Sequence, residues 1–93
     1  MRLSTKIELQ KLIDKIDEQD CEDCNGTLII SIMSRIRLEL DKMIPLEKND
    51  YMFIYGMYEA LGLIPMNDGF RAMYHDLGQQ IDTKYCKFIN NEV

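Results

Sequence analysis

The chain has 93 residues, of which 46% are hydrophobic and 29% are charged, and its formal net charge is −5. This composition is that of an ordinary globular protein and excludes a disordered tail, and the length predicts a single domain over residues 1–93. The excess of acidic residues argues against nucleic acid as a partner, because binding to a phosphate backbone normally depends on a basic face.

The distribution of apolar residues bears on location. Charged residues (Arg2, Lys6 and Glu8) interrupt the N-terminal segment early, unlike in a signal peptide, and the apolar run at 28–33 is far too short for a membrane span. The chain has three cysteines, and an odd number is more typical of reduced thiols than of a disulfide scaffold. We therefore expect a cytoplasmic protein without membrane contact.

The choice among hydrophobic residues is unusual. The sequence contains 12 isoleucines but only two alanines and no tryptophan. Such a choice is typical of AT-rich coding, as in phages, low-GC bacteria and some eukaryotic parasites. It describes a genome and carries no information on mechanism.

Residues 5–18 are predicted to form the first helix. Thr5 followed by Glu8 matches a capping box, in which the two side chains bond backbone N–H groups at a helix start. Apolar residues then recur at helical spacing: Leu9, Leu12, Ile13 and Ile16. The helix is expected to end in an acidic segment, 17–23, followed by a turn at Asn25-Gly26. We expect the acidic segment to be a solvated connection, and the alternative is a contact for a basic partner surface.

The second helix is predicted to begin at Thr27, to run for about 16 residues and to stop before Pro45. Its first six residues, TLIISI, favour a strand when taken alone, because they are rich in β-branched side chains. The continuation favours a helix, since apolar residues keep a four-residue step: Leu28, Ile32, Ile36 and Leu40. Arg35 and Glu39 lie one turn apart and are expected to pair.

The third helix is predicted within residues 50–64, which read DYMFIYGMYEALGLI, with Asp50 as its N-cap. Apolar or aromatic side chains occur nearly all the way round this segment. A helix of that kind cannot lie on the surface of a small domain, so we expect it to be central or shared with a partner. Its uncovered apolar surface predicts a homodimer or a higher oligomer.

The fourth helix is predicted to be capped by Asn67 or Asp68. Its apolar stripe covers more than five turns: Phe70, Met73, Tyr74, Leu77, Ile81, Tyr85 and Phe88. Gly78 within this stripe indicates a close helix–helix contact or a bend, because glycine otherwise weakens a helix interior. Four helical segments with short loops predict an all-α fold, either a compact four-helix bundle or paired helical hairpins.

The residue types used in catalysis and metal binding do not converge. Cys21 and Cys24 lie in the acidic segment, whose carboxylates would raise the thiol pKa values. The remaining ligand types, His75 and Cys86, are about 16 Å apart along one predicted helix, so one zinc ion cannot bridge them. We therefore predict no metal, no cofactor and no enzymatic activity.

Two further motifs are rejected. An EF-hand loop with Gly26 at its sixth position would put Cys21 first and Ile32 twelfth, where carboxylates are required. A helix-turn-helix around residues 64–68 would present an acidic recognition helix, which does not suit a DNA groove. The acidic residues concerned are Asp68, Asp76 and Asp82.

The third helix supplies the candidate site. Tyr51, Tyr55 and Tyr58 share one of its faces, and together with Met52 they are predicted to form a protein interface. The simpler interpretation is that the tyrosines close the rim of the chain's own core. A third interpretation is a ligand slot in which tyrosine rings stack on a base and three arginines hold phosphate: Arg35, Arg37 and Arg71.

The sequence therefore predicts a small acidic, non-enzymatic interaction protein that acts as a regulator, inhibitor or adaptor by binding another protein. The AT-rich coding suggests one form of this hypothesis, a phage-type inhibitor of a host protein. The alternative is an oligomeric protein that binds or sequesters a nucleotide-like small molecule.

Overall fold

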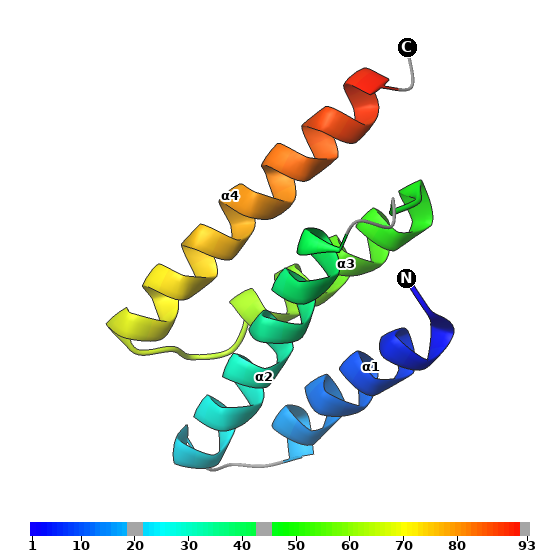
Figure 1. The fold of residues 1–93 in the computed structure, drawn as a ribbon. Coiled ribbons are helices and arrows are strands. Elements are labelled where there is room, and N and C mark those ends of the chain that lie inside the picture. The colour runs from blue at the N-terminus through cyan, green and yellow to red at the C-terminus, as the bar shows by residue number, and fades with distance from the viewer. Residues whose placement is uncertain (19–21, 43–45, 92–93) are drawn as a thin grey trace.

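The computed structural model describes residues 1–18, 22–42 and 46–91, which contain four helices and no strand (Figure 1). In chain order the helices are α1 (Leu3–Glu18), α2 (Glu22–Asp41), α3 (Lys48–Gly62) and α4 (Asp68–Asn91). The predicted all-α fold is confirmed. Over this part of the chain, none of the helices is long and apolar enough to cross a membrane.

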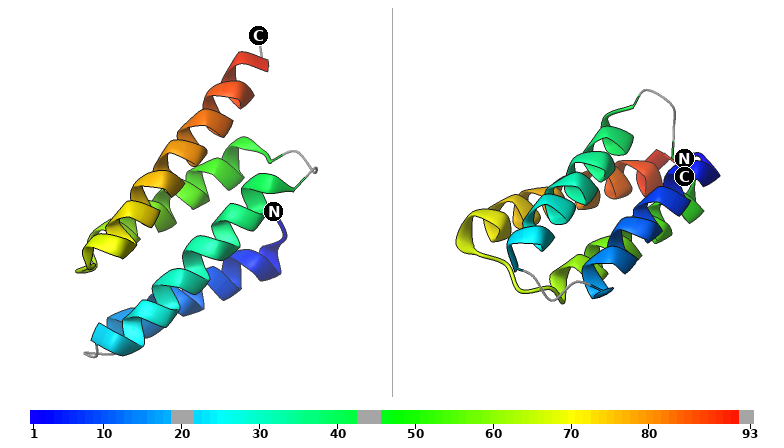
Figure 2. Two further views of the ribbon diagram at one scale, coloured as in Figure 1. Left: turned by 60° about the vertical axis from the view of Figure 1, so that its left-hand side comes forward. Right: turned by 90° about the horizontal axis from the view of Figure 1, so that it is seen from below.

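The helices form two antiparallel hairpins, α1 with α2 and α3 with α4 (Figures 1 and 2). The hairpins pack so that α2 lies against α4 and α1 lies against α3. The two helices of each of these pairs run in the same direction (Figure 1). Consequently α2 and α3 lie on a diagonal of the four-helix bundle, although they are consecutive in the chain.

A hydrophobic core runs between the four helices. Each helix contributes side chains that recur every three or four residues, which is the spacing that places them on one face. The largest fully buried side chains are Leu9, Ile29, Ile32, Ile36, Ile54, Leu61, Leu77 and Ile81. Burying one such side chain contributes about 1.5–3 kcal/mol, so packing of these stripes holds the helices together.

The structure does not enclose α3 within its own chain. Ile54 and Leu61 are fully buried, whereas Met52 on the opposite side of the helix is 47% exposed. The expectation of a central third helix is wrong, because α1 and α4 cover only the faces of α3 that lie toward the core. The outer face of α3 remains open.

The first helix begins earlier than predicted. The carbonyl of Arg2 accepts hydrogen bonds from the N–H groups of Thr5 at 3.1 Å and Lys6 at 3.3 Å. The predicted capping box is wrong, because Thr5 is a buried residue inside the first turns of α1. The Glu8 carboxylate instead accepts a bond from Arg35 of α2 at 2.7 Å.

The second helix also begins earlier than predicted and contains Asn25 and Gly26, so the predicted turn is wrong. A Cβ atom on Gly26 would lie 3.3 Å from the ring of Phe70, so this glycine permits close approach of an aromatic ring from α4. The predicted pairing of Arg35 with Glu39 is wrong as well, since the buried Glu39 accepts a bond from Lys42 at 2.8 Å.

The acidic segment 17–23 falls partly outside the described residues. Its backbone is helical at 17–18 and again at 22–23, while 19–21 and all the side chains of the segment lie outside the description. Both expectations for this segment, a solvated connection or a contact for a basic surface, stay predictions.

The start of α3 is tied to α1 through Asp50. This residue is not the N-cap but the third residue of the helix, and its carboxylate accepts a bond from the Glu47 N–H at 3.0 Å. The same carboxylate binds the α-amino group of Met1 at 2.9 Å and Lys6 Nζ at 3.0 Å. Burial would raise the pKa of Asp50, but these three partners outweigh it and lower the pKa to about 2.

The fourth helix is capped as predicted. The Asn67 side-chain oxygen accepts a hydrogen bond from the N–H of Phe70 at 2.9 Å. This bond satisfies one of the N–H groups that have no partner within the first turn of a helix.

Candidate functional site

The tyrosines of α3 face α4 of their own chain. The ring of Tyr51 packs on Tyr85 and Phe88, with centroid separations of 5.4 and 5.1 Å. The ring of Tyr55 meets Tyr85 edge to face at 5.5 Å, and its hydroxyl donates to the Asp82 carboxylate at 2.7 Å. These contacts form an aromatic seam along the α3–α4 hairpin.

The seam continues in a reciprocal contact between Tyr58 and Tyr74. Their rings stack with centroids 4.0 Å apart, and the Tyr74 hydroxyl donates to the carbonyl of Tyr58 at 2.9 Å. Each ring ends over a glycine of the opposite helix, Tyr74 over Gly62 and Tyr58 over Gly78, where any Cβ atom would overlap the hydroxyl. The predicted close helix–helix contact at Gly78 is confirmed.

The pKa values of Tyr55 and Tyr74, two tyrosines of the seam, are raised. Burial raises the pKa of Tyr74 to about 12, aided by Tyr58 and by the charge of Glu59. Burial also raises the pKa of Tyr55, and the hydrogen bond to Asp82 adds to this effect. At neutral pH both groups are therefore hydrogen-bond donors that join α3 to α4.

The structure separates the four residues of the predicted interface. Tyr51 is only 6% exposed, and Tyr55 and Tyr58 are half-buried in the seam, whereas Met52 stands on the outer face of α3. A partner could reach Met52 without any movement of α4. It could reach only the exposed edges of Tyr55 and Tyr58.

The three arginines of the predicted ligand slot lie apart. Arg35 pairs with α1, whereas Arg37 is about 200° further round α2 and so projects from the opposite side. The buried Nε atom of Arg37 has no hydrogen-bond partner among the described residues. Arg71 follows Phe70 in α4, and the ring of Phe70 contacts Gly26 of α2. Gly26 and Arg35 are roughly 14 Å apart along α2, so Arg71 lies far from Arg35. The arginines do not converge on one phosphate in this conformation.

The candidate metal ligands are also dispersed. Among the described side chains, no group of three or more His, Cys, Asp or Glu residues could hold a metal ion. Cys86 is an exposed free thiol, and His75 is exposed beside the ring of Tyr74. Cys21 and the side chain of Cys24 lie outside the described part of the chain, so the expectation of plain thiols stays a prediction.

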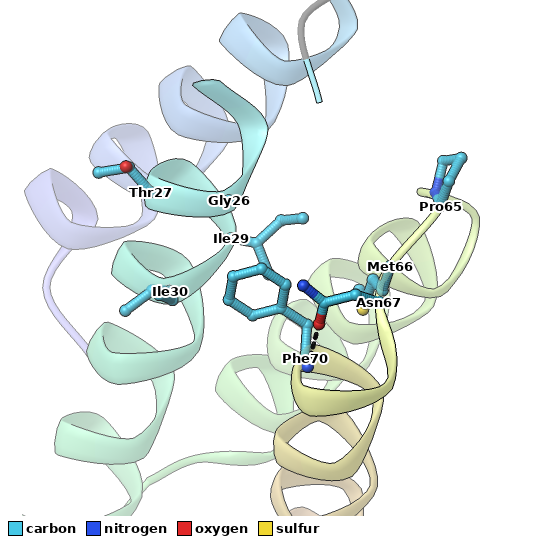
Figure 3. A pocket seen from close by; sticks show the side chains of 8 residues that line it. All are labelled: Gly26, Thr27, Ile29, Ile30, Pro65, Met66, Asn67 and Phe70. Carbon is cyan, nitrogen blue, oxygen red and sulfur yellow. Dashed lines mark hydrogen bonds between the residues drawn. The ribbon is translucent and has the colours of Figure 1, made fainter. Parts of the chain in front are cut away.

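A cleft opens at the end of the bundle where α2 and α4 begin (Figure 3). Its volume is about 530 Å³, and three segments of the chain line it. The lining residues are Gly26, Thr27, Ile29 and Ile30 of α2, Pro65, Met66 and Asn67 of the α3–α4 loop, and Phe70 of α4.

The cleft is open to solvent, and the surface facing into it is polar and apolar in about equal parts. Ile30 is 41% exposed, and Met66 and Phe70 are half-buried. Asn67 is fixed at the rim by its bond to the N–H of Phe70 (Figure 3). A concave site of this size, with exposed apolar side chains beside polar groups, has room for one or two side chains of another molecule.

The sequence alone does not predict this cleft. One signal was present, since Ile30 stands among polar residues, Thr27, Ser31 and Ser34, on the outer side of α2. The other wall depends on the packing of Phe70 against α2, which no periodicity within one helix can indicate.

Comparisons of the chain with protein-family models, with curated proteins and with solved structures found no match.

Proposed function

We propose that this chain is a small acidic protein that acts without catalysis by binding another protein, and that the cleft receives an apolar side chain of that partner. The observation that carries the proposal is a concave surface, open to solvent, built from the start of α2, the α3–α4 loop and the start of α4, with exposed apolar side chains, Ile30, Met66 and Phe70, among polar groups. Anchor side chains of protein complexes bury themselves in such pockets, and Phe and Met are enriched at the contact.

The charge of the chain supports a basic partner. The net charge is −5, and the acidic segment 17–23 leads directly into the helix that forms one wall of the cleft. Complementary charge speeds encounter and discriminates between partners. A regulator, an inhibitor or an adaptor would use the cleft in this way, and a phage-type inhibitor of a host protein is one form of the proposal. The nucleotide-binding alternative has less support, because Arg35 and Arg37 project from opposite sides of α2.

Replacing Ile30 tests the cleft. Ile30→Asp puts a charge at its mouth, and an unpaired charge facing an apolar anchor should weaken partner binding at least about tenfold. Native mass spectrometry of the protein purified from its native cells would show the co-purifying partner with the wild type and its loss with this variant.

The matched control is Leu38→Asp, which makes the same kind of change two turns along α2, at a side chain that is 59% exposed and outside the cleft. The control should retain the partner. Equal retention by both variants, or equal loss with both, would contradict the cleft as the binding site. A bound mass of a few hundred daltons in place of a protein would favour the small-molecule alternative.

A further inference from the structure

The outer face of α3 carries a mixed stripe, here named the outer stripe, that lies directly opposite the buried face of the helix. Its apolar members are well exposed, Met52 at 47% and Leu63 at 87%. Its members fall within about 80° of one another around the helix axis. They are Lys48, Met52, Gly56 and Glu59 of α3, and Leu63, the C-cap residue that follows the helix.

Gly56 in this stripe has no explanation within its own chain. Among the described residues, and apart from its chain neighbours and the backbone of its own helix, no atom lies within 4 Å of the position that a Cβ on Gly56 would take, whereas Gly62 and Gly78 each receive a tyrosine ring. A glycine in a helix interior makes the helix less stable than an alanine at the same position. Because glycine has no Cβ, it allows another backbone or side chain to approach the helix closely.

The charges of the stripe are arranged to suit a second copy of the same helix. Lys48 and Glu59 are exposed, and neither has an ion-pair partner among the described residues. Two copies with a net charge of −5 each repel one another over most of their surfaces, but this stripe holds one positive and one negative charge. When a second copy of α3 runs antiparallel to the first, Lys48 of each copy lies near Glu59 of the other.

We infer that two copies of this chain associate through their outer stripes, with the two α3 helices antiparallel about a two-fold axis that crosses the stripe at the level of Ile54 along the helix axis. Met52 and Gly56 lie two residues on either side of this point, so Met52 of each copy faces the hollow over Gly56 of the other. Lys48 and Glu59 lie about 9 and 7.5 Å from the same point along the axis, so each lysine lies opposite a glutamate. The stripe is self-complementary in shape and charge.

The proposed dimer uses a different face from the cleft and does not depend on what binds there. A single crossing of two helices buries less than a standard interface, so the association is weak and concentration-dependent. Sedimentation velocity from low to high micromolar concentration would show the 11.0 kDa chain passing into a dimer.

Charge reversal within the stripe is the test. Lys48→Glu and Glu59→Lys each replace two attractive pairs with two repulsive ones, and each should raise the dissociation constant at least about tenfold. Lys11→Glu and Asp76→Lys make the same changes of net charge at exposed residues of α1 and α4, and they should leave the dissociation constant within about twofold of the wild type.

Mixing the variants tests the antiparallel geometry. An equimolar mixture of Lys48→Glu and Glu59→Lys restores both pairs in a heterodimer, and the double variant restores them in a homodimer. Both should associate about as well as the wild type. Failure of both to recover would overturn the pairing of Lys48 with Glu59.

Gly56→Ala and Met52→Ala separate association from folding. Gly56→Ala should raise the thermal midpoint of the dilute monomer by a few degrees, because the added Cβ meets no neighbour, and yet weaken the dimer. Met52→Ala should weaken the dimer with little effect on that midpoint. A wild type that remains at 11.0 kDa at high micromolar concentration overturns the inference, while the partner-binding result for Ile30→Asp stands or falls separately.

Discussion

At the scale of single residues, Asp50 takes part in two of the ion pairs among the described residues. Its carboxylate joins the first turn of α3 to the α-amino group of Met1 and to Lys6, and its side chain is only 8% exposed. These contacts lower its pKa from 3.8 to about 2. The ionised form is therefore stabilised by folding, which makes stability depend on pH.

We predict that the free energy of unfolding falls by about 2 kcal/mol between about pH 4 and pH 2 through this one group. The folded-state pKa lies below the unfolded one, so the contribution is present above pH 4 and is lost as the carboxylate is protonated at lower pH. Asp50→Asn should cost about 2 kcal/mol at pH 7 in urea unfolding and should flatten this part of the pH profile. Glu8→Gln, which affects an exposed ion pair, should cost less than about 1 kcal/mol. An unchanged profile for Asp50→Asn would contradict the role assigned to it.

At the scale of elements, the α3–α4 hairpin depends on two glycines that receive two tyrosine rings. Gly78→Ala gains helix propensity worth about 1 kcal/mol, but its Cβ would overlap the ring of Tyr58. We predict a net destabilisation of about 1–3 kcal/mol, because the rigid ring can move only by disturbing its stack with Tyr74.

A double-mutant cycle checks this prediction. Tyr58→Phe removes the hydroxyl that lies nearest to the added Cβ, so the combined variant should recover at least about 0.5 kcal/mol relative to the sum of the single changes. Gly56→Ala in dilute solution is the control, since it makes the same change on α3 without a neighbour and should stabilise the chain. Equal effects of the two alanines would show that propensity alone governs both positions.

At the scale of the whole molecule, the four helices share one core, but tyrosine fluorescence reports on the α3–α4 hairpin alone. All five tyrosines lie in α3 or α4, whereas far-UV circular dichroism reports on every helix. The predicted single domain over residues 1–93 therefore has a direct test, which is whether the two signals unfold together.

We predict that Ile36→Ala, a change in α2, lowers the free energy of unfolding by about 2–5 kcal/mol and shifts the tyrosine fluorescence transition and the circular dichroism transition equally. Ile36 is fully buried, and α2 packs against α4, so loss of its side chain should be felt by the tyrosines of the other hairpin. A tyrosine transition that stays at its wild-type position would show that the hairpins unfold independently.

The helices themselves could be predicted because their periodicity is a property of each segment alone. Ile54 and Leu61 are buried in α3, and Leu77 and Ile81 in α4, as their spacing indicates. The helices α1 and α2 begin earlier than the sequence predicts, at Leu3 and Glu22. Thr5 and Gly26 have residue types that suit caps and turns, and only the surrounding helices give them other roles.

The candidate sites were decided by tertiary structure. Four residues of α3 cannot by themselves indicate which neighbour they will meet, and the order of helices in the bundle turns Tyr51 toward α4 and leaves Met52 outside. The cleft exists because the ring of Phe70 packs on Gly26, 44 residues away in the chain. Sequence by itself determined which faces of the helices are apolar, since that depends only on spacing. Which of those faces meet within the chain and which stay open was decided by packing, because contacts between distant segments depend on how all four helices fit together.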